Sequence, residues 1–333
     1  MFLDAIVGQE AAVAALRQML ASGRVPSALL FLGPHHVGKR TTALALARAL
    51  NCHRNDGTAC GVCPACRKID AGVHPDVDVV VPDGQFIKIG QVREVSNRLG
   101  LIPREARKRV VVLARAERMN PPAAHAFLKT LEEPPVDTLI VLCAASAAEL
   151  FDTITSRCLP LRFGLLPDPA VRSLLGDSNG LSAEVLEFAV RFARGRARQE
   201  LRERAGQWLL IREELIAALA RPEGQDFAEL TDKSAKWTAT EDWRFVLQWL
   251  ETWFRDLAVL GGGTGSASLI NLDREEALWA AQGHFPPHVA ESCYRQVLAA
   301  RAGMLLNANK ALALDALWMG CREAVRNRTG GIL

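Results

Sequence analysis

Hydrophobic positions follow two patterns along the first half of the chain. Short, predominantly apolar runs predict strands, at residues 28–32, 77–81, 110–113, 139–142 and 159–163. Between these runs, apolar residues recur at helical spacing, at residues 11–20, 41–50, 89–99 and from about 120 to 132. Strands that alternate with helices and are apolar on both faces predict a mostly parallel sheet covered by helices on each side. The expected fold class of residues 1–165 is therefore α/β.

The strand pattern stops after Leu165, and the rest of the chain is predicted to be helical. Residues 170 to about 205 have the pattern of a small helical unit, and long amphipathic helices follow from about residue 213. These helices hold most of the tryptophans, which favour a packed core over an interface: Trp237, Trp243, Trp249, Trp253, Trp279 and Trp318.

Composition and charge narrow the class of protein. The chain has 333 residues, of which 49% are hydrophobic, so more than one domain core is expected. It has no apolar run of about eighteen residues and no basic N-terminal region before an apolar one, and we therefore expect a soluble intracellular protein. A net charge of +3 argues against a strongly basic nucleic-acid binder. A local basic cluster favours a solvated loop and helix face over a DNA site: Arg104, Arg107, Lys108 and Arg109.

Residues 33–39, Gly-Pro-His-His-Val-Gly-Lys, spell a phosphate-binding loop between a predicted strand and a predicted helix. Arg40 follows where a working NTPase has the Ser or Thr that holds magnesium. The strand at 110–113 runs into Ala114 and Arg115, where acidic residues would organise magnesium and water. We therefore expect no Mg²⁺ catalysis. ATP or ADP binding stays open, because Lys39 can still pair with phosphates and Arg40 can contact a phosphate or fill the metal position.

Four of the eight cysteines fall close together, with gaps of seven, two and two residues. This spacing is typical of thiolates around a tetrahedral metal, and zinc is the first choice. The predicted ligands are Cys52, Cys60, Cys63 and Cys66, in an insert at about residues 50–68. Four protein ligands leave no open position, so the zinc would be structural. Unligated buried thiols and an iron–sulfur cluster are the alternatives.

Several segments together resemble the subunits of the bacterial DNA polymerase III clamp loader. They are Val7-Gly8-Gln9, Gly33-Pro34 with Gly38 to Thr41, the four clustered cysteines, Ala126 to Pro135, Ser156-Arg157-Cys158, and Asn307 to Lys310. The resemblance implies an AAA+ P-loop module with a parallel sheet at 1–165, a helical lid at 166–207, and an all-α collar at 208–333 that joins subunits in a ring.

The resemblance also implies roles for single residues. Val7 looks like part of an adenine pocket, in a degenerate nucleotide site with Gly33, Gly38, Lys39, Arg40 and Thr41. Arg157 looks like an arginine finger that acts in trans on a neighbouring ATPase subunit, and its alternative is an ordinary surface arginine. Arg196 and Arg198 lie where a phosphate-sensing arginine of the lid would fall, and plain surface charges explain them equally well.

Together with the missing magnesium ligands, the resemblance implies a non-hydrolysing clamp loader subunit that assists ATP-dependent loading of the sliding clamp on primed DNA during replication. It would lack ATPase activity of its own within a DNA-directed DNA polymerase holoenzyme. The implied partners are ATPase subunits of gamma/tau type and a delta subunit in a heteropentamer, with the clamp and primer-template DNA reached through the complex. A cytoplasmic, nucleoid-associated location follows. The alternatives are an active motor-type ATPase subunit and a stand-alone AAA+ DNA-repair factor.

Overall fold

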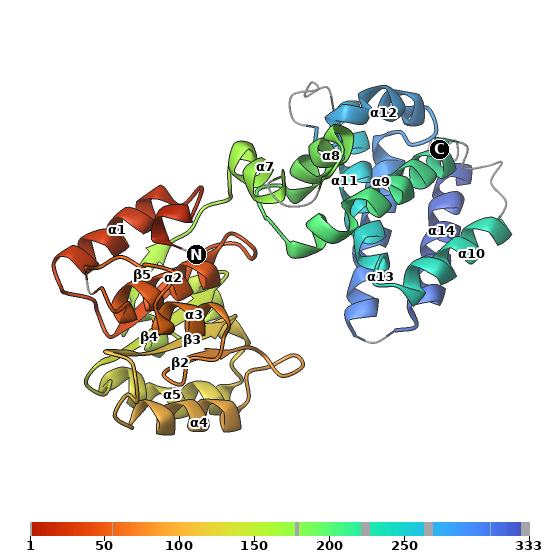
Figure 1. The fold of residues 1–333 in the computed structure, drawn as a ribbon. Coiled ribbons are helices and arrows are strands. Elements are labelled where there is room, and N and C mark those ends of the chain that lie inside the picture. The colour runs from red at the N-terminus through yellow and green to blue at the C-terminus, as the bar shows by residue number, and fades with distance from the viewer. Residues whose placement is uncertain are drawn as a thin grey trace. The chain divides into compact units, whose positions relative to one another are not determined.

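The computed structural model describes residues 2–54, 56–176, 180–220, 227–262, 269–306 and 308–327. Asn307, the first residue of the C-terminal motif, lies outside these ranges. The chain forms two compact units (Figure 1). The first comprises residues 1–178 with 193–198, and the second comprises residues 179–192 with 199–333.

The first unit is built on a five-stranded sheet in the order β2-β3-β4-β1-β5, and every neighbouring pair is parallel. The strands are β1 (Ala28–Leu32), β2 (Val77–Val80), β3 (Arg109–Ala114), β4 (Thr138–Ala144) and β5 (Leu159–Arg162). Each lies where an apolar run predicts it. The predicted α/β fold class with a parallel sheet is thus confirmed.

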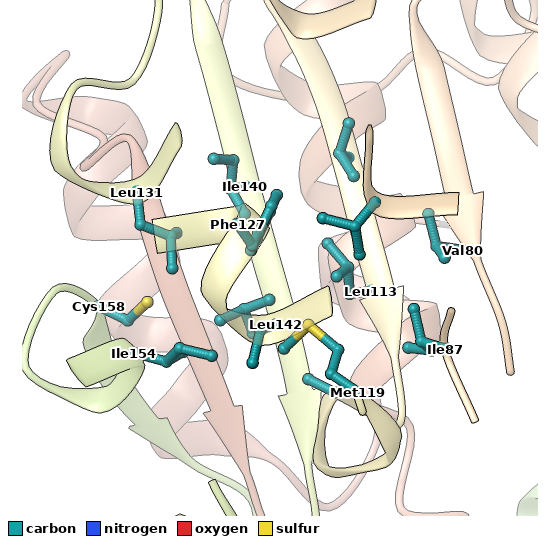
Figure 2. Close-up of a cluster of buried hydrophobic side chains, with 14 of the residues drawn as sticks. Val80, Ile87, Leu113, Met119, Phe127, Leu131, Ile140, Leu142, Ile154 and Cys158 are labelled. Carbon is teal, nitrogen blue, oxygen red and sulfur yellow. The ribbon is translucent and has the colours of Figure 1, made fainter. Parts of the chain in front are cut away.

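Helices cover both faces of this sheet (Figure 1). On one face lie α1 (Glu10–Ala21), α2 (Lys39–Asn51) and α3 (Pro64–Asp70), and on the other lie α4 (Ile89–Leu99) and α5 (Pro121–Glu132). Val110 and Val112 of β3 belong to the first core, and Val111 and Leu113 to the second. Figure 2 shows the second core, where Phe127 of α5 packs against the sheet. Two covered faces explain the consecutive apolar residues of the central strands β1, β3 and β4, whereas the edge strand β5 is largely exposed.

Short elements complete the first unit. They are the 3₁₀ helices η1 (Leu3–Ala5), η2 (Ala116–Arg118) and η3 (Ala147–Glu149), and the helices α6 (Asp152–Thr155) and α7 (Asp168–Gly176). Two of them adjoin strands of the sheet, since η2 follows β3 and α6 precedes β5. Each therefore extends from an end of the sheet.

The second unit is helical throughout its described residues. Its elements are α8 (Ala183–Ala193), α9 (Gln199–Ala220), α10 (Phe227–Ala239), α11 (Trp243–Gly261), η5 (Leu272–Arg274), α12 (Glu275–Gln282), α13 (Pro287–Leu305) and α14 (Lys310–Arg326). The predicted tryptophan core is confirmed for five of the six side chains, while Trp279 is 50% exposed. Helix α9 crosses the predicted boundary at 207/208, and the three-part division of the chain stays a prediction. Among the described helices, none has the length and apolar character needed to span a membrane.

Candidate functional site

The phosphate-loop sequence connects the end of β1 to the start of α2, as predicted. Gly33 opens the loop beside the end of β5, where the Phe163 N–H donates to the Leu32 carbonyl at 2.7 Å. A Cβ on Gly33 would lie 2.0 Å from the Phe163 carbonyl oxygen. Glycine is therefore required here by the close approach of a neighbouring backbone as well as by the loop motif.

The N-terminus of α2 is available to an anion. Gly38 is the N-cap residue, with φ of 95°, and no side chain caps the first turn. The Thr42 hydroxyl donates to the Gly38 carbonyl at 2.9 Å, so it leaves the amides of the first turn unoccupied. Free amides and the positive end of a helix are the usual components of a phosphate site. His36, within the loop, has φ of 62°, a conformation that few residues other than glycine adopt.

Lys39 is folded back onto its own loop. Its ammonium group donates to the Pro34 carbonyl at 2.6 Å and also to the Gly33 carbonyl. The residue is 7% exposed, and this desolvation lowers the pKa of Lys39 from its ordinary value. Arg40 is exposed and Thr41 is half-buried. Only Lys39 among these three is thus held inside the loop.

The two positions that should carry acidic residues lie at the end of β3. Ala114 is in register with Cys143 of β4, and Arg115 follows in a left-handed conformation with φ of 61°. No carboxylate comes from either position. Glu117, two residues further on in η2, supplies one instead: its Oε1 lies 3.6 Å from His35 Nε2 and 3.7 Å from Arg115 Nε. Its only sequence signal is an acidic residue shortly after a strand, which does not show where the side chain lies.

The loop and its surroundings are rich in cationic and titratable groups. Desolvation is the main cause that lowers the pKa of His35. Desolvation also lowers the pKa of His36 to about 4, and the charge of Arg198 is the next cause. Arg198 therefore lies in the field of the loop, while Arg196 is exposed.

The segment before α1 joins the loop to the end of β5 through Gln9. This side chain is 4% exposed, and its amide donates to the carbonyls of Val37 at 3.1 Å and Gly164 at 2.8 Å. The Gly164 N–H donates back to Gln9 Oε1 at 3.0 Å. Val7, the predicted adenine-pocket residue, is 36% exposed two positions earlier. Gln9 is thus a structural residue of this region, and Val7 is accessible.

Arg157 lies at the surface between α6 and β5, with its side chain 34% exposed. Its guanidinium donates to the Thr153 carbonyl at 2.8 Å and to Glu132 Oε1 at 2.6 Å. Glu132 ends α5, so a residue of the Ala126 to Pro135 motif holds the arginine of the Ser156-Arg157-Cys158 motif. A trans role for Arg157 stays a prediction.

The four clustered cysteines converge as predicted. Their Sγ atoms all lie within 4.8 Å of one another, between the end of α2 and the start of α3. Backbone N–H groups donate to three of them, from Cys60 to Cys52 at 3.3 Å, from Cys63 to Cys60 at 3.3 Å, and from Cys66 to Cys63 at 3.5 Å. A tetrahedral zinc ion, with bonds of about 2.3 Å to sulfur, places its ligands about 3.8 Å apart. The cluster therefore fits such an ion after small side-chain movements.

The local dipoles favour ionised sulfur at two of these cysteines. The N–H groups of Val62 and Cys63 lower the pKa of Cys60 to about 6. Burial raises the pKa of Cys63, but the N–H groups of His53 and Cys66 lower it by more, so it lies below its ordinary value. Burial raises the pKa of Cys66 to about 12. Thiolates are the form that binds metal, so this cluster could hold a metal ion.

A phosphate-loop sequence between β1 and α2 of a parallel sheet is the arrangement of a P-loop fold, and here a thiol cluster follows α2. Residues 8–166 match the family described as DNA polymerase III, delta subunit. This segment, just under half of the chain, is similar to that family, and subunits named delta-prime are among its relatives.

Three relatives illustrate the likeness. The DNA polymerase III delta-prime subunit of Bacillus subtilis is 35% identical over 48% of this chain and 49% of its own length. That of Pseudomonas aeruginosa is 41% identical over 40% of this chain and 41% of its own. The gamma/tau subunit of Mycobacterium bovis is 34% identical over 51% of this chain and 30% of its own. The chain thus spans half or less of the length of these relatives.

A solved structure extends over most of the chain, with a weaker likeness. It is a DNA polymerase III gamma subunit-related protein from Thermotoga maritima, 18% identical with a TM-score of 0.46, and the match covers 94% of this chain and 99% of that one.

Proposed function

We propose that this chain is a non-hydrolysing subunit of a DNA polymerase III clamp loader that supplies Arg157 to the active site of a neighbouring ATPase subunit. The observation that carries the proposal is the state of the chain's own loop. Neither Ala114 nor Arg115 provides a carboxylate, and Arg40 replaces the hydroxyl that would bind magnesium. Without these ligands the main charge stabilisation of phosphoryl transfer is missing.

Arg157 has the chemistry that such a role requires. A guanidinium offers a planar fork of donors, which matches the oxygens of a transferring phosphoryl group. With a side chain 34% exposed, Arg157 is accessible from solvent, and its bond to Glu132 orients it while it is free. When Arg157 reaches a phosphate bound to the neighbouring subunit, that phosphate would replace Glu132 as its partner.

The remaining proposals follow from the family. The partners are ATPase subunits of gamma/tau type and a delta subunit in a heteropentamer, which loads the sliding clamp on primed DNA in the cytoplasm, near the nucleoid. The cysteine cluster would hold a structural Zn²⁺ through Cys52, Cys60, Cys63 and Cys66. The lid at 166–207 and the collar at 208–333 would complete the AAA+ subunit.

An active motor-type ATPase is the second candidate. The likeness to gamma/tau subunits favours it, because it is as long and nearly as high in identity as the likeness to the Bacillus delta-prime subunit. Glu117 also brings a carboxylate to the loop. ATP turnover by the isolated chain separates the two candidates.

The test of the proposed function is Arg157→Ala in a loader rebuilt from purified subunits. ATP hydrolysis and clamp loading should fall, while assembly stays unchanged in gel filtration. An arginine finger contributes on the order of 10³- to 10⁵-fold at its own site, and the overall loss should be partial because other interfaces retain their fingers. Arg157→Lys should not restore the rate fully, because an ammonium cannot make the forked contact.

The matched control is Arg162→Ala, which removes an exposed arginine of the adjacent strand β5. It should leave both rates unchanged. Equal ATPase rates for the wild-type and Arg157→Ala loaders would reduce Arg157 to an ordinary surface charge.

A further inference from the structure

Glu117 is a buried anion beside the phosphate loop. Its side chain is 3% exposed, and neither carboxylate oxygen has a hydrogen-bond partner among the described residues. A buried carboxylate without hydrogen bonds is unfavourable unless nearby positive charge compensates for it. The groups around Glu117 therefore explain why it is tolerated there.

The nearest charged groups to Glu117 are cationic or can become so. Its Oε1 lies 3.6 Å from His35 Nε2 within the loop and 3.7 Å from Arg115 Nε. The charge of Glu117 also acts on Lys39, where it raises the pKa against the effect of desolvation. Glu117 thus interacts with groups of the phosphate loop that would otherwise attract a bound phosphate.

The backbone holds Glu117 in this place. Arg115 adopts its left-handed conformation at the end of β3, and the chain then turns through η2. Ala116 and Met119, on either side of Glu117, are buried in the core beneath α5 (Figure 2 labels Met119). Because both are anchored there, the position of Glu117 is fixed by core packing and does not depend on a bound ligand.

Lys39, the lysine of the phosphate loop, already has hydrogen-bond partners within the chain. Lys39 donates to the carbonyls of Gly33 and Pro34, which are parts of its own loop. To bind, a nucleotide phosphate would have to replace these carbonyls as the partner of Lys39. It would also have to compete with the Glu117 carboxylate for the positive charge of Lys39. Both changes oppose binding.

We propose that Glu117 is the internal anion of this phosphate loop and excludes nucleoside di- and triphosphates from it. A phosphate in the loop would be a second anion near Glu117, whose own carboxylate is shielded from water, and like charges that are close together repel. The neutral isostere Glu117→Gln should therefore open the site. This inference is independent of Arg157, because it concerns the chain alone.

The experiment is a titration of the full chain with ADP by calorimetry, with Mg²⁺ and with EDTA. We expect no saturable binding by the wild-type chain at up to about 1 mM ADP, and tighter binding by at least about tenfold for Glu117→Gln, the effect of removing one like charge at this range. Binding by the variant should persist in EDTA, because Arg40 and Arg115 replace the usual magnesium ligands. Adding Lys39→Ala to the variant should abolish it.

The matched control is Glu149→Gln. Glu149 is an exposed carboxylate whose charge also acts on His35, so this change removes one nearby negative charge without touching the buried position. It should leave ADP binding as in the wild type. Equal affinities of the Glu117→Gln and Glu149→Gln variants would overturn the proposal. So would magnesium-dependent binding by the wild type that Glu117→Gln weakens, because Glu117 would then be a ligand of the bound metal nucleotide.

Measurements on the wild-type chain test the proposal even if Glu117→Gln does not fold. A nucleotide that binds the folded state raises the thermal midpoint of unfolding. We expect about 1 mM ADP to leave the midpoint of the wild-type chain unchanged, and a clear rise would count against an internal anion.

Discussion

At the scale of single residues, Asp76 and Arg109 form a buried ion pair in the sheet unit. Asp76 is fully buried, and its carboxylate accepts backbone N–H groups from Arg104, Glu105 and Ala106 at 2.8–3.0 Å. Arg109 Nη2 donates to the same carboxylate at 2.7 Å and is 3% exposed. The expectation of a solvated basic face is therefore wrong for Arg109, which is a structural cation.

We predict that Asp76→Asn destabilises the protein by about 3–5 kcal/mol, because it leaves the buried Arg109 without its counter-charge. The measurement is the free energy of unfolding in urea. Asp83→Asn is the control: Asp83 is 65% exposed and pairs with Lys88 at the surface, so the change should cost about 1 kcal/mol or less. Similar losses for the two variants would contradict a structural role for the buried pair.

The same carboxylate predicts part of the pH dependence of stability. Burial raises the pKa of Asp76, but the three backbone N–H groups and Arg109 lower it by more, so it lies below the ordinary value of 3.8. A group whose folded pKa is depressed stabilises the protein above its unfolded pKa and loses this contribution as pH falls through the folded pKa. The wild type should therefore lose stability below about pH 4, measured by urea unfolding, and Asp76→Asn should lack this component.

At the scale of elements, the cysteine insert is attached to the sheet unit by contacts that do not involve sulfur. Arg48 of α2, 2% exposed, pairs with Asp70 of α3. The amide of Asn51 bonds in both directions with the backbone of Lys108, at 2.9 and 3.0 Å. The base of the insert is thus held independently of any metal.

We predict that the purified chain carries about one zinc, and that Cys63→Ser loses it without unfolding the sheet unit, because metal binding is coupled to local folding. Elemental analysis gives the zinc content, and circular dichroism tests the core. Val62→Ser, a change at an exposed position of the same insert, should retain the metal. Finding no zinc in freshly reduced, chelator-free wild-type protein would rule out this assignment.

At the scale of the whole molecule, we predict that the isolated chain releases no phosphate from Mg-ATP above background. Ala114, Arg115 and Arg40 replace the groups that bind magnesium and orient water. The assay compares the wild-type chain with Lys39→Ala, and the two should be indistinguishable. Turnover in the wild type that Lys39→Ala abolishes would instead support the motor-type ATPase.

The sequence by itself determined the elements and the departures from the motif. All five strands could be predicted from apolar runs, and Asn120 before two prolines marks the start of α5. Arg40, Ala114 and Arg115 could be recognised because each is defined by its offset from a motif or strand end. The cysteine cluster was predictable for the same reason, since its spacing is short. These are all local properties, which backbone geometry and side-chain periodicity fix over a few residues.

Only the tertiary structure decided which distant residues meet. Parallel strands require crossover connections, so the order β2-β3-β4-β1-β5 brings together ends of strands that are far apart in the sequence. That packing sets Glu117 against His35, Asp76 against Arg109, and Arg157 against Glu132. A charge pattern along the chain cannot show such pairs, because burial and pairing of a charge depend on the fold around it. The sequence therefore showed which catalytic ligands were missing, and the fold placed the Glu117 carboxylate beside the loop.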